Sequence, residues 1–276
     1  MSPTGKRFEG RRALVTGASR GIGAAIAQRL AAEGADVAVT ARTKDRHPTL
    51  PGSLEETASL LAGYGGRAAV IVADMADADD RARIVPEAAD ALGGPVEILV
   101  NNAAAAIYQP LSDYPLRRRR LIFEVNAHGP IDLAQAALPA MLAAGEGWIV
   151  NVSSGSARLT DGPPFRAGAM SATIGVYGAS KAALNRLTNA LAVELYGTGV
   201  RINTVEPRAA VHSVGADVHL GDSLPADMYE SMEEMVEGTV ALCDCDADHT
   251  GRVDVSLDLI DERGLTVMGL DGRPHP

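Results

Sequence analysis

The feature that most constrains the fold is an alternation of short apolar runs with segments of helical length. The first run, Arg12–Gly17, precedes an amphipathic segment, Ile22–Ala32, that predicts a helix ending at Gly34. Each further run is rich in β-branched residues, as buried parallel strands are. These runs are Val37–Thr40, Ala68–Ala73, Ile98–Val100, Trp148–Val152 and Ile202–Val205.

The repeated strand and helix pattern predicts an α/β fold, a doubly wound and mostly parallel sheet of the Rossmann type with helices on both faces. The pattern needs no internal break, so we expect residues 1–276 to form one dinucleotide-binding and catalytic domain. Two segments, 160–173 and 208–227, follow predicted strands and fit neither the strand pattern nor the helix pattern. Either they are ordinary surface loops or they cover a substrate site at the carboxyl edge of the sheet.

The composition argues against some classes of binding partner. The net charge of −10 argues against nucleic acid or an anionic membrane as the main partner, and the segment Met1–Arg12 lacks the apolar stretch of a secretory signal, so a cytoplasmic location is expected. The two cysteines, Cys243 and Cys245, lie among Asp244, Asp246, Asp248 and His249. Because the usual C-x-x-C pairs of metal sites are missing, a solvated acidic turn is favoured over a metal site, and no metal is expected.

A glycine-rich segment, Thr16–Gly23, stands between the first predicted strand and the first predicted helix. Glycines there let the backbone approach a pyrophosphate, whose charge the helix N-terminus attracts. Glycine triplets alone could form a structural turn, but their position favours dinucleotide binding. The residues expected to contact the cofactor are Gly17, Ser19, Arg20, Gly21, Ile22 and Gly23.

The end of the second predicted strand bears on the choice between NADP and NAD. An acidic side chain there accepts hydrogen bonds from the ribose hydroxyls and repels a 2′-phosphate. This chain has Ala41 and Arg42 instead, and Arg42 with Arg20 can pair with a phosphate. NADP is therefore the favoured cofactor, with NAD possible and with both arginines as mere surface groups being the alternative.

Tyr177 and Lys181 are spaced by four residues at the start of a long apolar-periodic segment that predicts a helix to about Leu195. This spacing puts both side chains on one face, where the ammonium can stabilise a phenolate. An ordinary phenol has a pKa of about 10, so a neighbouring cation would bring that pKa closer to the working range of a general acid or base.

With these motifs in order, the chain resembles the short-chain dehydrogenase/reductase family over roughly Phe8–Asp258. The resemblance implies that Ser154 binds the substrate oxygen, that Asn126 supports a water-linked proton relay through Lys181, and that Tyr177 is the general acid or base. Ser153 or Ser154 could instead cap the strand end, and Asn126 could satisfy local backbone. The resemblance also places Asp74, Met75, Asn102, Ala103, Tyr177, Lys181 and Pro207 at the cofactor.

Three positions depart from the family pattern. Ala104 replaces the glycine of its N-N-A-G segment, and Ser154 and Tyr177 lie 23 positions apart, farther than is usual, so residues 160–173 resemble an insertion beside the substrate site. Arg208 stands where the family usually has glycine after Pro207, and it is expected near the nicotinamide or the substrate entrance.

The run Arg117–Arg120 could suggest nucleic-acid binding, but the chain is acidic and the run lacks interleaved aromatic residues. A solvated face or a subunit contact is favoured. The predicted helices around Ile122–Leu142 and Val176–Leu195 are where family members associate, which implies a homodimer or homotetramer.

The favoured function is hydride transfer between NADP(H) and a small-molecule carbonyl or secondary alcohol. The alternative is a nucleotide-sensing regulatory protein that keeps the fold without turnover. A serine hydrolase is disfavoured because the chain has no G-x-S-x-G elbow, and Ser154 lies in Val152–Ser156 instead.

Overall fold

The computed structural model describes residues 6–45, 51–165, 169–208, 210–211 and 229–274. The chain alternates strands and helices: β1 (Arg12–Thr16), α1 (Gly21–Ala32), β2 (Asp36–Ala41), α2 (Leu54–Ala62), β3 (Ala68–Val72), α3 (Ala78–Leu92), β4 (Ile98–Asn101), α4 (Leu116–Phe123), α5 (Gly129–Ala144), β5 (Gly147–Val152), α6 (Gly175–Leu195), β6 (Val200–Glu206), β7 (Ala210–Val211), β8 (Tyr229–Glu230), α8 (Met232–Val240), β9 (Val253–Val255) and α9 (Ser256–Arg263).

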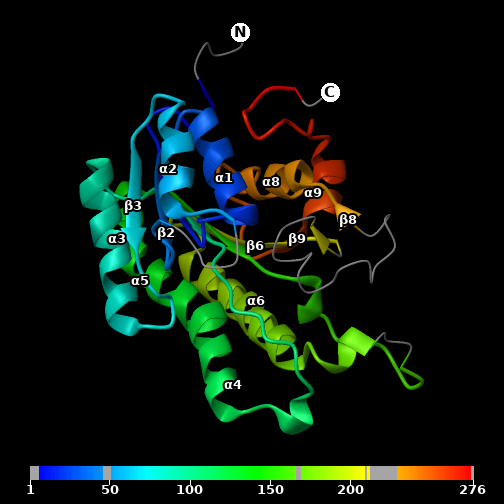
Figure 1. Ribbon diagram of the computed structural model, residues 1–276. Coiled ribbons are helices and arrows are strands. Elements are labelled where there is room, and N and C mark those ends of the chain that lie inside the picture. The colour runs from blue at the N-terminus through cyan, green and yellow to red at the C-terminus, as the bar shows by residue number, and fades with distance from the viewer. Residues whose placement is uncertain (1–5, 46–50, 166–168, 209, 212–228, 275–276) are drawn as a thin grey trace.

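Seven of the described strands form one parallel sheet in the order β3-β2-β1-β4-β5-β6-β9, which confirms the doubly wound fold (Figure 1). The order reverses between β1 and β4, and ligands bind at such a switch point in open α/β sheets. The strand β9 has only three residues and was not predicted. The short strands β7 and β8 pair separately, beyond the carboxyl end of β6.

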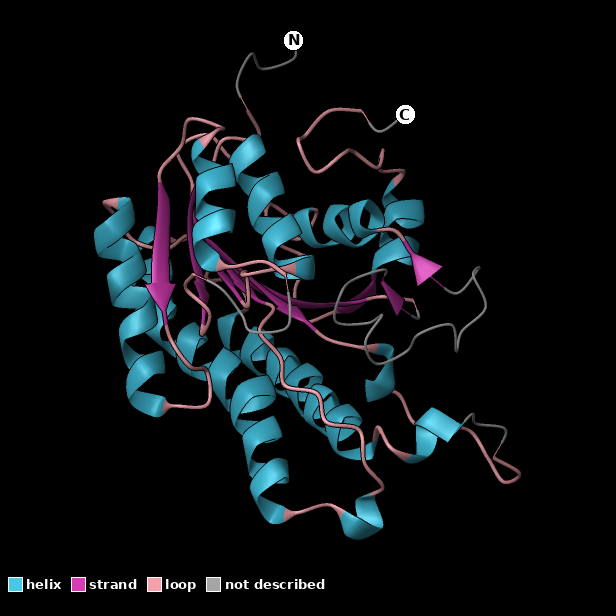
Figure 2. Cartoon of the chain, viewed as in Figure 1, coloured by secondary structure: helices cyan, strands magenta, loops and turns pink. Residues whose placement is uncertain are grey.

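Helices cover both faces of the sheet (Figure 2). Alternate residues of each strand point to opposite faces, so Val15 of β1 packs in the cluster beneath α1 and α8, whereas Leu14 packs in the cluster beneath α3, α5 and α6. Both side chains are fully buried. Two apolar layers therefore hold the sheet rigidly between helices.

Polar side chains fix where several helices begin. The Ser53 hydroxyl caps α2 by accepting from the Glu56 amide, and the Asp77 carboxylate caps α3. At α8, Ser231 and Glu234 form a reciprocal capping box. These caps satisfy amides that the first helical turn leaves without partners.

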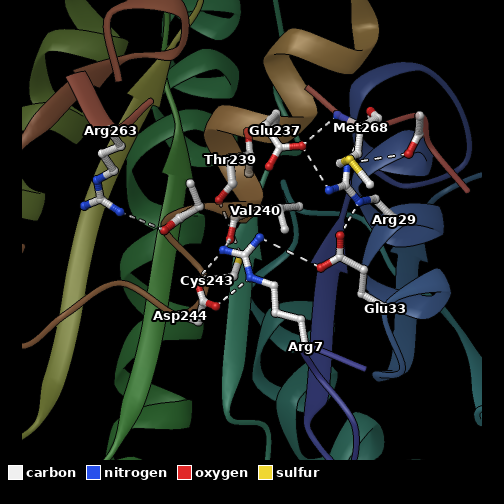
Figure 3. A network of polar contacts seen from close by, with 12 residues as sticks. Arg7, Arg29, Glu33, Glu237, Thr239, Val240, Cys243, Asp244, Arg263 and Met268 are labelled. Atoms are coloured by element: carbon white, nitrogen blue, oxygen red, sulfur yellow. Dashed lines mark hydrogen bonds and ion pairs between the residues drawn. The ribbon is translucent and has the colours of Figure 1, made fainter. Parts of the chain in front are cut away.

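An ion-pair network, buried around Arg29 and partly exposed around Arg7, joins the first and last described segments to α1 and α8 (Figure 3). The Arg29 guanidinium of α1 pairs with Glu33 and with Glu237 of α8, and it also donates to the Met268 carbonyl. Arg7 pairs with Asp244 just after α8. The first and last described segments are thus fastened to the same helix pair.

The cysteine segment is more buried than the sequence suggested. Both thiols lie in the core, with Cys243 Sγ donating to the Thr239 carbonyl and Cys245 Sγ to the His249 carbonyl. The expected solvated turn holds for Asp246 and Asp248 but not for the cysteines. Among the described residues, no cluster of three or more His, Cys, Asp or Glu side chains has the arrangement to hold a metal ion.

Candidate active site

One cavity of about 720 Å³ runs along the carboxyl edge of the sheet, from the glycine-rich loop to Tyr177. It is lined by nearly all of the cofactor residues predicted from the sequence. These are Gly17, Ser19, Arg20, Gly21, Ile22, Arg42, Asp74, Met75, Asn102, Ala103, Tyr177, Lys181 and Pro207.

The glycine-rich loop is fixed against the loop that follows β4. The Asn102 side chain donates to the Thr16 carbonyl (2.9 Å), and the Thr16 hydroxyl accepts from the amides of Asn102 and Ala103. Gly17 has a φ of +66°, and a Cβ there would lie 2.7 Å from the Ala103 Cα. Gly23 does not line the cavity; a Cβ there would lie 2.3 Å from Asn102 Nδ2. Its predicted role at the cofactor becomes one of close packing behind the loop.

The residues at this end fit a dinucleotide. Gly21 has a φ of +57° and open space where a Cβ would be. Helix α1 begins without a side-chain cap and without an acidic residue in its first turn, so its free amides favour an anion. Beside them, the Arg20 Nε is a buried donor with no partner among the described residues. An anionic group in this cradle would satisfy donors that the protein itself leaves unsatisfied.

Arg20 and Arg42 stand at the outer end of the cavity. Arg20 Nη2 donates to the Gly52 carbonyl (3.1 Å), which holds the side chain over the glycine-rich loop. The Arg42 side chain is 73% exposed, and its Nη1 lies 3.9 Å from Asp74 Oδ2. An exposed pair at this distance is weak, so Arg42 is available to another anion.

Tyr177 and Lys181 lie on the first turns of α6 and face the other end of the cavity. Lys181 Nζ donates to the Val152 carbonyl (2.7 Å) and lies 5.9 Å from the centroid of the Tyr177 ring. Burial lowers the pKa of Lys181 to about 8, which leaves it mostly protonated at neutral pH. The long helix therefore places an ammonium beside the phenol, as its spacing predicted.

The pKa of Tyr177 runs against expectation. Burial raises it, the nearby Tyr108 adds to the increase, and a hydrogen bond with the Ser154 side chain acts in the opposite direction. The effect of burial therefore outweighs the lowering that was expected from the Lys181 ammonium. Tyr177 is a neutral phenol in this structure, poised to donate a proton rather than to accept one.

The structure separates the two candidate serines. Ser154 Oγ bonds to Tyr177 and accepts hydrogen bonds from the amide (3.2 Å) and hydroxyl (3.0 Å) of Ser156. Ser153 Oγ is buried and has no partner among the described groups. Both serines line the cavity, but only Ser154 bonds to Tyr177, which supports its assignment to the substrate oxygen.

Asn126 lies in a single π-helical turn, Glu124–His128, where α4 passes into α5. Its side-chain oxygen Oδ1 accepts from the Ala105 backbone amide (2.7 Å). Its side-chain nitrogen Nδ2 donates to the Ala105 backbone carbonyl and to the Ser180 hydroxyl (both 2.9 Å). Ser180 in turn donates to the Tyr177 carbonyl. Asn126 thus ties the loop after β4 to the helix that carries Tyr177, whereas its role in a proton relay remains a prediction.

Arg208 does not line the cavity. Its guanidinium donates to Asp258 at 2.6 Å and lies 3.9 Å from Asp261, both on α9. This ion pair draws the side chain away from the position expected at the nicotinamide or substrate entrance. The preceding Pro207 does line the cavity, so the backbone follows the expected course.

The sequence analysis missed Tyr108, which lines the cavity, and Ser156, which holds Ser154. Tyr108 follows the N-N-A-A segment closely, a position from which a side chain could have been expected to reach the site. Ala210 and Val211, which form β7, belong to segment 208–227 and also line the cavity.

The described residues include most of segment 160–173 but few of segment 208–227. Segment 160–173 includes a 3₁₀ turn, Ala169–Ala172, and the Thr173 carbonyl accepts from the Gln109 amide (3.0 Å) beside the cavity. Segment 208–227 lies largely outside the described residues. A role for either as a substrate cover stays a prediction.

Arg117–Arg120 form most of the exposed surface of α4. Arg118 donates to Gln109 Oε1 at 2.8 Å.

No helix in the described ranges is both long enough and apolar enough to cross a membrane.

Comparison with known proteins places this geometry in a family. The family model for short chain dehydrogenases matches residues 11–219. Hydroxysteroid dehydrogenase-like protein 2 from Danio rerio is 30% identical over 265 residues, 96% of this chain and 61% of that protein. The ketoacyl reductase HetN of Nostoc is 35% identical over 198 residues, 72% of this chain and 63% of that protein. The chain spans about three fifths of the length of these curated relatives.

Solved structures agree in fold. A short chain dehydrogenase from Burkholderia cenocepacia, in complex with NADP, is 34% identical with a TM-score of 0.76, covering 90% of this chain and 97% of that one. A 3-oxoacyl (acyl-carrier-protein) reductase from Agrobacterium tumefaciens with NADP bound is 30% identical, also with a TM-score of 0.76, covering 90% and 93%. Together with the family match, these likenesses show that the chain belongs to the short-chain dehydrogenase family of NAD(P)-dependent oxidoreductases.

Proposed function

We propose that the chain transfers a hydride between NADP(H) and a carbonyl or secondary alcohol, with Tyr177 as the general acid or base. One observation carries the proposal: the Tyr177 phenol, bonded to Ser154 and beside Lys181, stands at the inner end of a cavity whose outer end is a dinucleotide cradle. Hydride chemistry belongs to the cofactor, and the protein supplies orientation and the proton.

Each side chain has a distinct task in the reducing direction. The Tyr177 hydroxyl gives its proton to the carbonyl oxygen as that oxygen gains negative charge. The Ser154 hydroxyl donates a hydrogen bond to the same oxygen, and the hydrogen bonds from Ser156 leave its own proton free for this. The Lys181 ammonium stabilises the phenolate that remains and holds the ribose hydroxyls of the cofactor. A proton from solvent then returns to the Tyr177 phenolate and completes the cycle.

Preference for NADP rests on charge at the outer end. Arg20 has a buried unpaired Nε and Arg42 is bound only weakly, while Ala41 offers no carboxylate to repel a 2′-phosphate. Hydrogen bonds to charged groups contribute about 1.5–3 kcal/mol each, and exposure reduces this, so we expect about a ten- to hundredfold preference for NADPH. The NADP bound to the Burkholderia and Agrobacterium structures supports this choice.

The test is turnover of a carbonyl panel with NADPH and NADH. The names of the relatives suggest including a ketosteroid and a 3-oxoacyl thioester in the panel. Tyr177→Phe should abolish turnover and leave NADPH affinity nearly unchanged, because only the transferable proton is lost. Tyr64→Phe is the matched control, since the Tyr64 hydroxyl bonds to Gln28 and Tyr64 does not line the cavity. Tight NADPH binding without turnover of any panel member would instead support a nucleotide-sensing protein.

We also propose that the chain associates through α4, α5 and α6 as a homodimer or homotetramer. Helix α6 exposes Leu187 (40%) and Val193 (72%), and Tyr196 just after it is 69% exposed. Apolar side chains exposed along one helix are typical of subunit contacts. Size-exclusion chromatography with light scattering would measure the mass of the assembly directly, and a monomer at micromolar concentration would contradict the proposal.

A further inference from the structure

The residue of most interest beyond the reaction centre is Tyr108. It lies in the loop that follows β4 and lines the cavity. Its ring centroid is 6.0 Å from that of Tyr177, and the two ring planes are nearly perpendicular at 87°. This is the edge-to-face arrangement that aromatic pairs favour. Tyr108 therefore touches the proposed proton donor itself.

The loop around Tyr108 is held in place on both sides. The Ile107 carbonyl accepts from the Tyr114 hydroxyl at 2.9 Å, and the Gln109 amide donates to the Thr173 carbonyl at 3.0 Å. Ala105 lies three residues before Tyr108, and the Asn126 side chain binds both its amide and its carbonyl. A side chain flanked by such anchors keeps one orientation, and a preorganised wall discriminates between ligands better than a mobile one does.

Apart from Lys181, the described residues that line the cavity around Tyr177 are uncharged. Of the charged side chains that line the cavity, Arg20, Arg42 and Asp74 belong to the glycine-rich end, and Lys181 donates to the Val152 carbonyl. Apart from Ser153, Ser154 and Lys181, the described lining at the Tyr177 end is aliphatic or aromatic. It includes Ala105, Ala106, Ile107, Tyr108, Ala210 and Val211.

Tyr108 itself adds no charge at working pH. Burial raises its pKa above the ordinary value for tyrosine, so the phenol stays neutral. A half-buried neutral ring at the reaction centre offers an apolar face to whatever group stands beside the reacting carbonyl. A carboxylate or phosphate held against this face would lose water, and the aliphatic side chains around it offer no hydrogen-bond donor in return.

We infer that Tyr108 is a specificity-determining residue, whose ring contacts the substituent on the reacting carbonyl and favours an uncharged substrate with a flat, conjugated group at that position. The inference rests on the proposed function, because it assumes that a carbonyl is reduced at Tyr177. It assigns the choice of substrate to a residue outside the Tyr177, Lys181, Ser154 and Asn126 set.

Two probes separate ring contact from general hydrophobicity. Acetophenone and cyclohexyl methyl ketone have the same carbon skeleton, but only the first has a flat aromatic ring. Wild type should reduce acetophenone with the higher kcat/KM, by about two- to tenfold, the range that an aromatic contact supplies. Tyr108→Leu should bring the two values together, mainly through KM for acetophenone, and Tyr108→Phe should keep the preference. The anionic 4-acetylbenzoate should be the poorest of the three ketones for wild type.

Binding without turnover provides an independent measurement. Saturation-transfer NMR of acetophenone with NADP⁺-loaded protein should show transfer from wild type and Tyr108→Phe, and weaker transfer from Tyr108→Leu. Tyr64→Leu is the matched control, because Tyr64 lies outside the cavity and its hydroxyl bonds to Gln28.

The outcomes separate the two proposals. If wild type reduces ketones but Tyr108→Leu keeps both the substrate ratio and the NMR transfer, the role of Tyr108 is overturned and the reaction stands. If wild type reduces no ketone while transfer still falls in Tyr108→Leu, the Tyr108 contact stands and the reaction is overturned.

Discussion

Lys181 should impose a measurable pH dependence on stability. The folded chain lowers its pKa from 10.5 to about 8 by burial, whereas the unfolded chain restores the ordinary value. Between these values the unfolded state binds the extra proton, so the free energy of unfolding rises with pH. Below pH 8 both states carry the ammonium, and the folded state bears the full cost of burying it. A shift of this size corresponds to about 3 kcal/mol in total.

Lys181→Met isolates this effect because methionine fills similar space and does not titrate. The wild-type stability minus the variant stability should increase by about 2–3 kcal/mol between pH 7 and pH 10. Other titrating groups are common to both proteins and cancel in the difference. The absolute offset includes the hydrogen bond lost at the Val152 carbonyl, so the slope is the decisive quantity.

Urea unfolding can be followed through Trp148, the only tryptophan in the chain. Its ring is 5% exposed, and the guanidiniums of Arg11 and Arg201 lie 4.9 and 5.0 Å from its centroid. Unfolding removes this environment and should change the emission strongly. Lys44→Met serves as the control because Lys44 is 56% exposed. Parallel stability curves for wild type and Lys181→Met from pH 7 to 10 would refute the reasoning.

Three further perturbations test other parts of the structure. Arg29→Met should lower the free energy of unfolding by about 3–5 kcal/mol at pH 7, because it leaves the buried Glu237 carboxylate without its cation; unfolding in urea gives the value, and a loss under 1 kcal/mol would contradict it. Asn126→Ala should release both hydrogen bonds to Ala105 and speed amide hydrogen exchange there, with kcat falling more than NADPH affinity; unchanged exchange would show that the loop is held by other contacts. Arg42→Ala should weaken NADPH selectively, measured as kcat/KM with each cofactor, and equal losses for NADPH and NADH would remove Arg42 from the phosphate site.

The fold was readable from the sequence because it depends on local patterns. Buried parallel strands such as β5 consist almost wholly of apolar residues, and the glycine-rich loop carries its own conformational signature. Strand β9 escaped prediction because three residues, Val253–Val255, give no periodicity to detect. Its place in the sheet comes from pairing with β6, which is a tertiary property.

The site was predictable only where sequence spacing fixes geometry. Tyr177 and Lys181 share a helix face by virtue of spacing, and the structure keeps them together. The direction of the Tyr177 pKa shift depends on burial by the whole site, which spacing cannot show. Arg208 was misplaced for a similar reason, since its partner Asp258 is 50 residues away and the ion pair forms only in the folded chain.

The switch point between β1 and β4 has a consequence for how the molecule forms. Asn102 and Thr16, whose hydrogen bond closes the cofactor cradle, are separated by 86 positions, and β2, β3 and the helices between them must be accommodated first. Such distant pairings make loop closure entropically costly, and chains with many of them fold slowly. A ribosome-bound chain that ends before β4 has the whole glycine-rich loop but lacks the partners that shape it. Cofactor can therefore stabilise only chains that have already joined their two halves, so added dinucleotide should slow unfolding more than it accelerates folding.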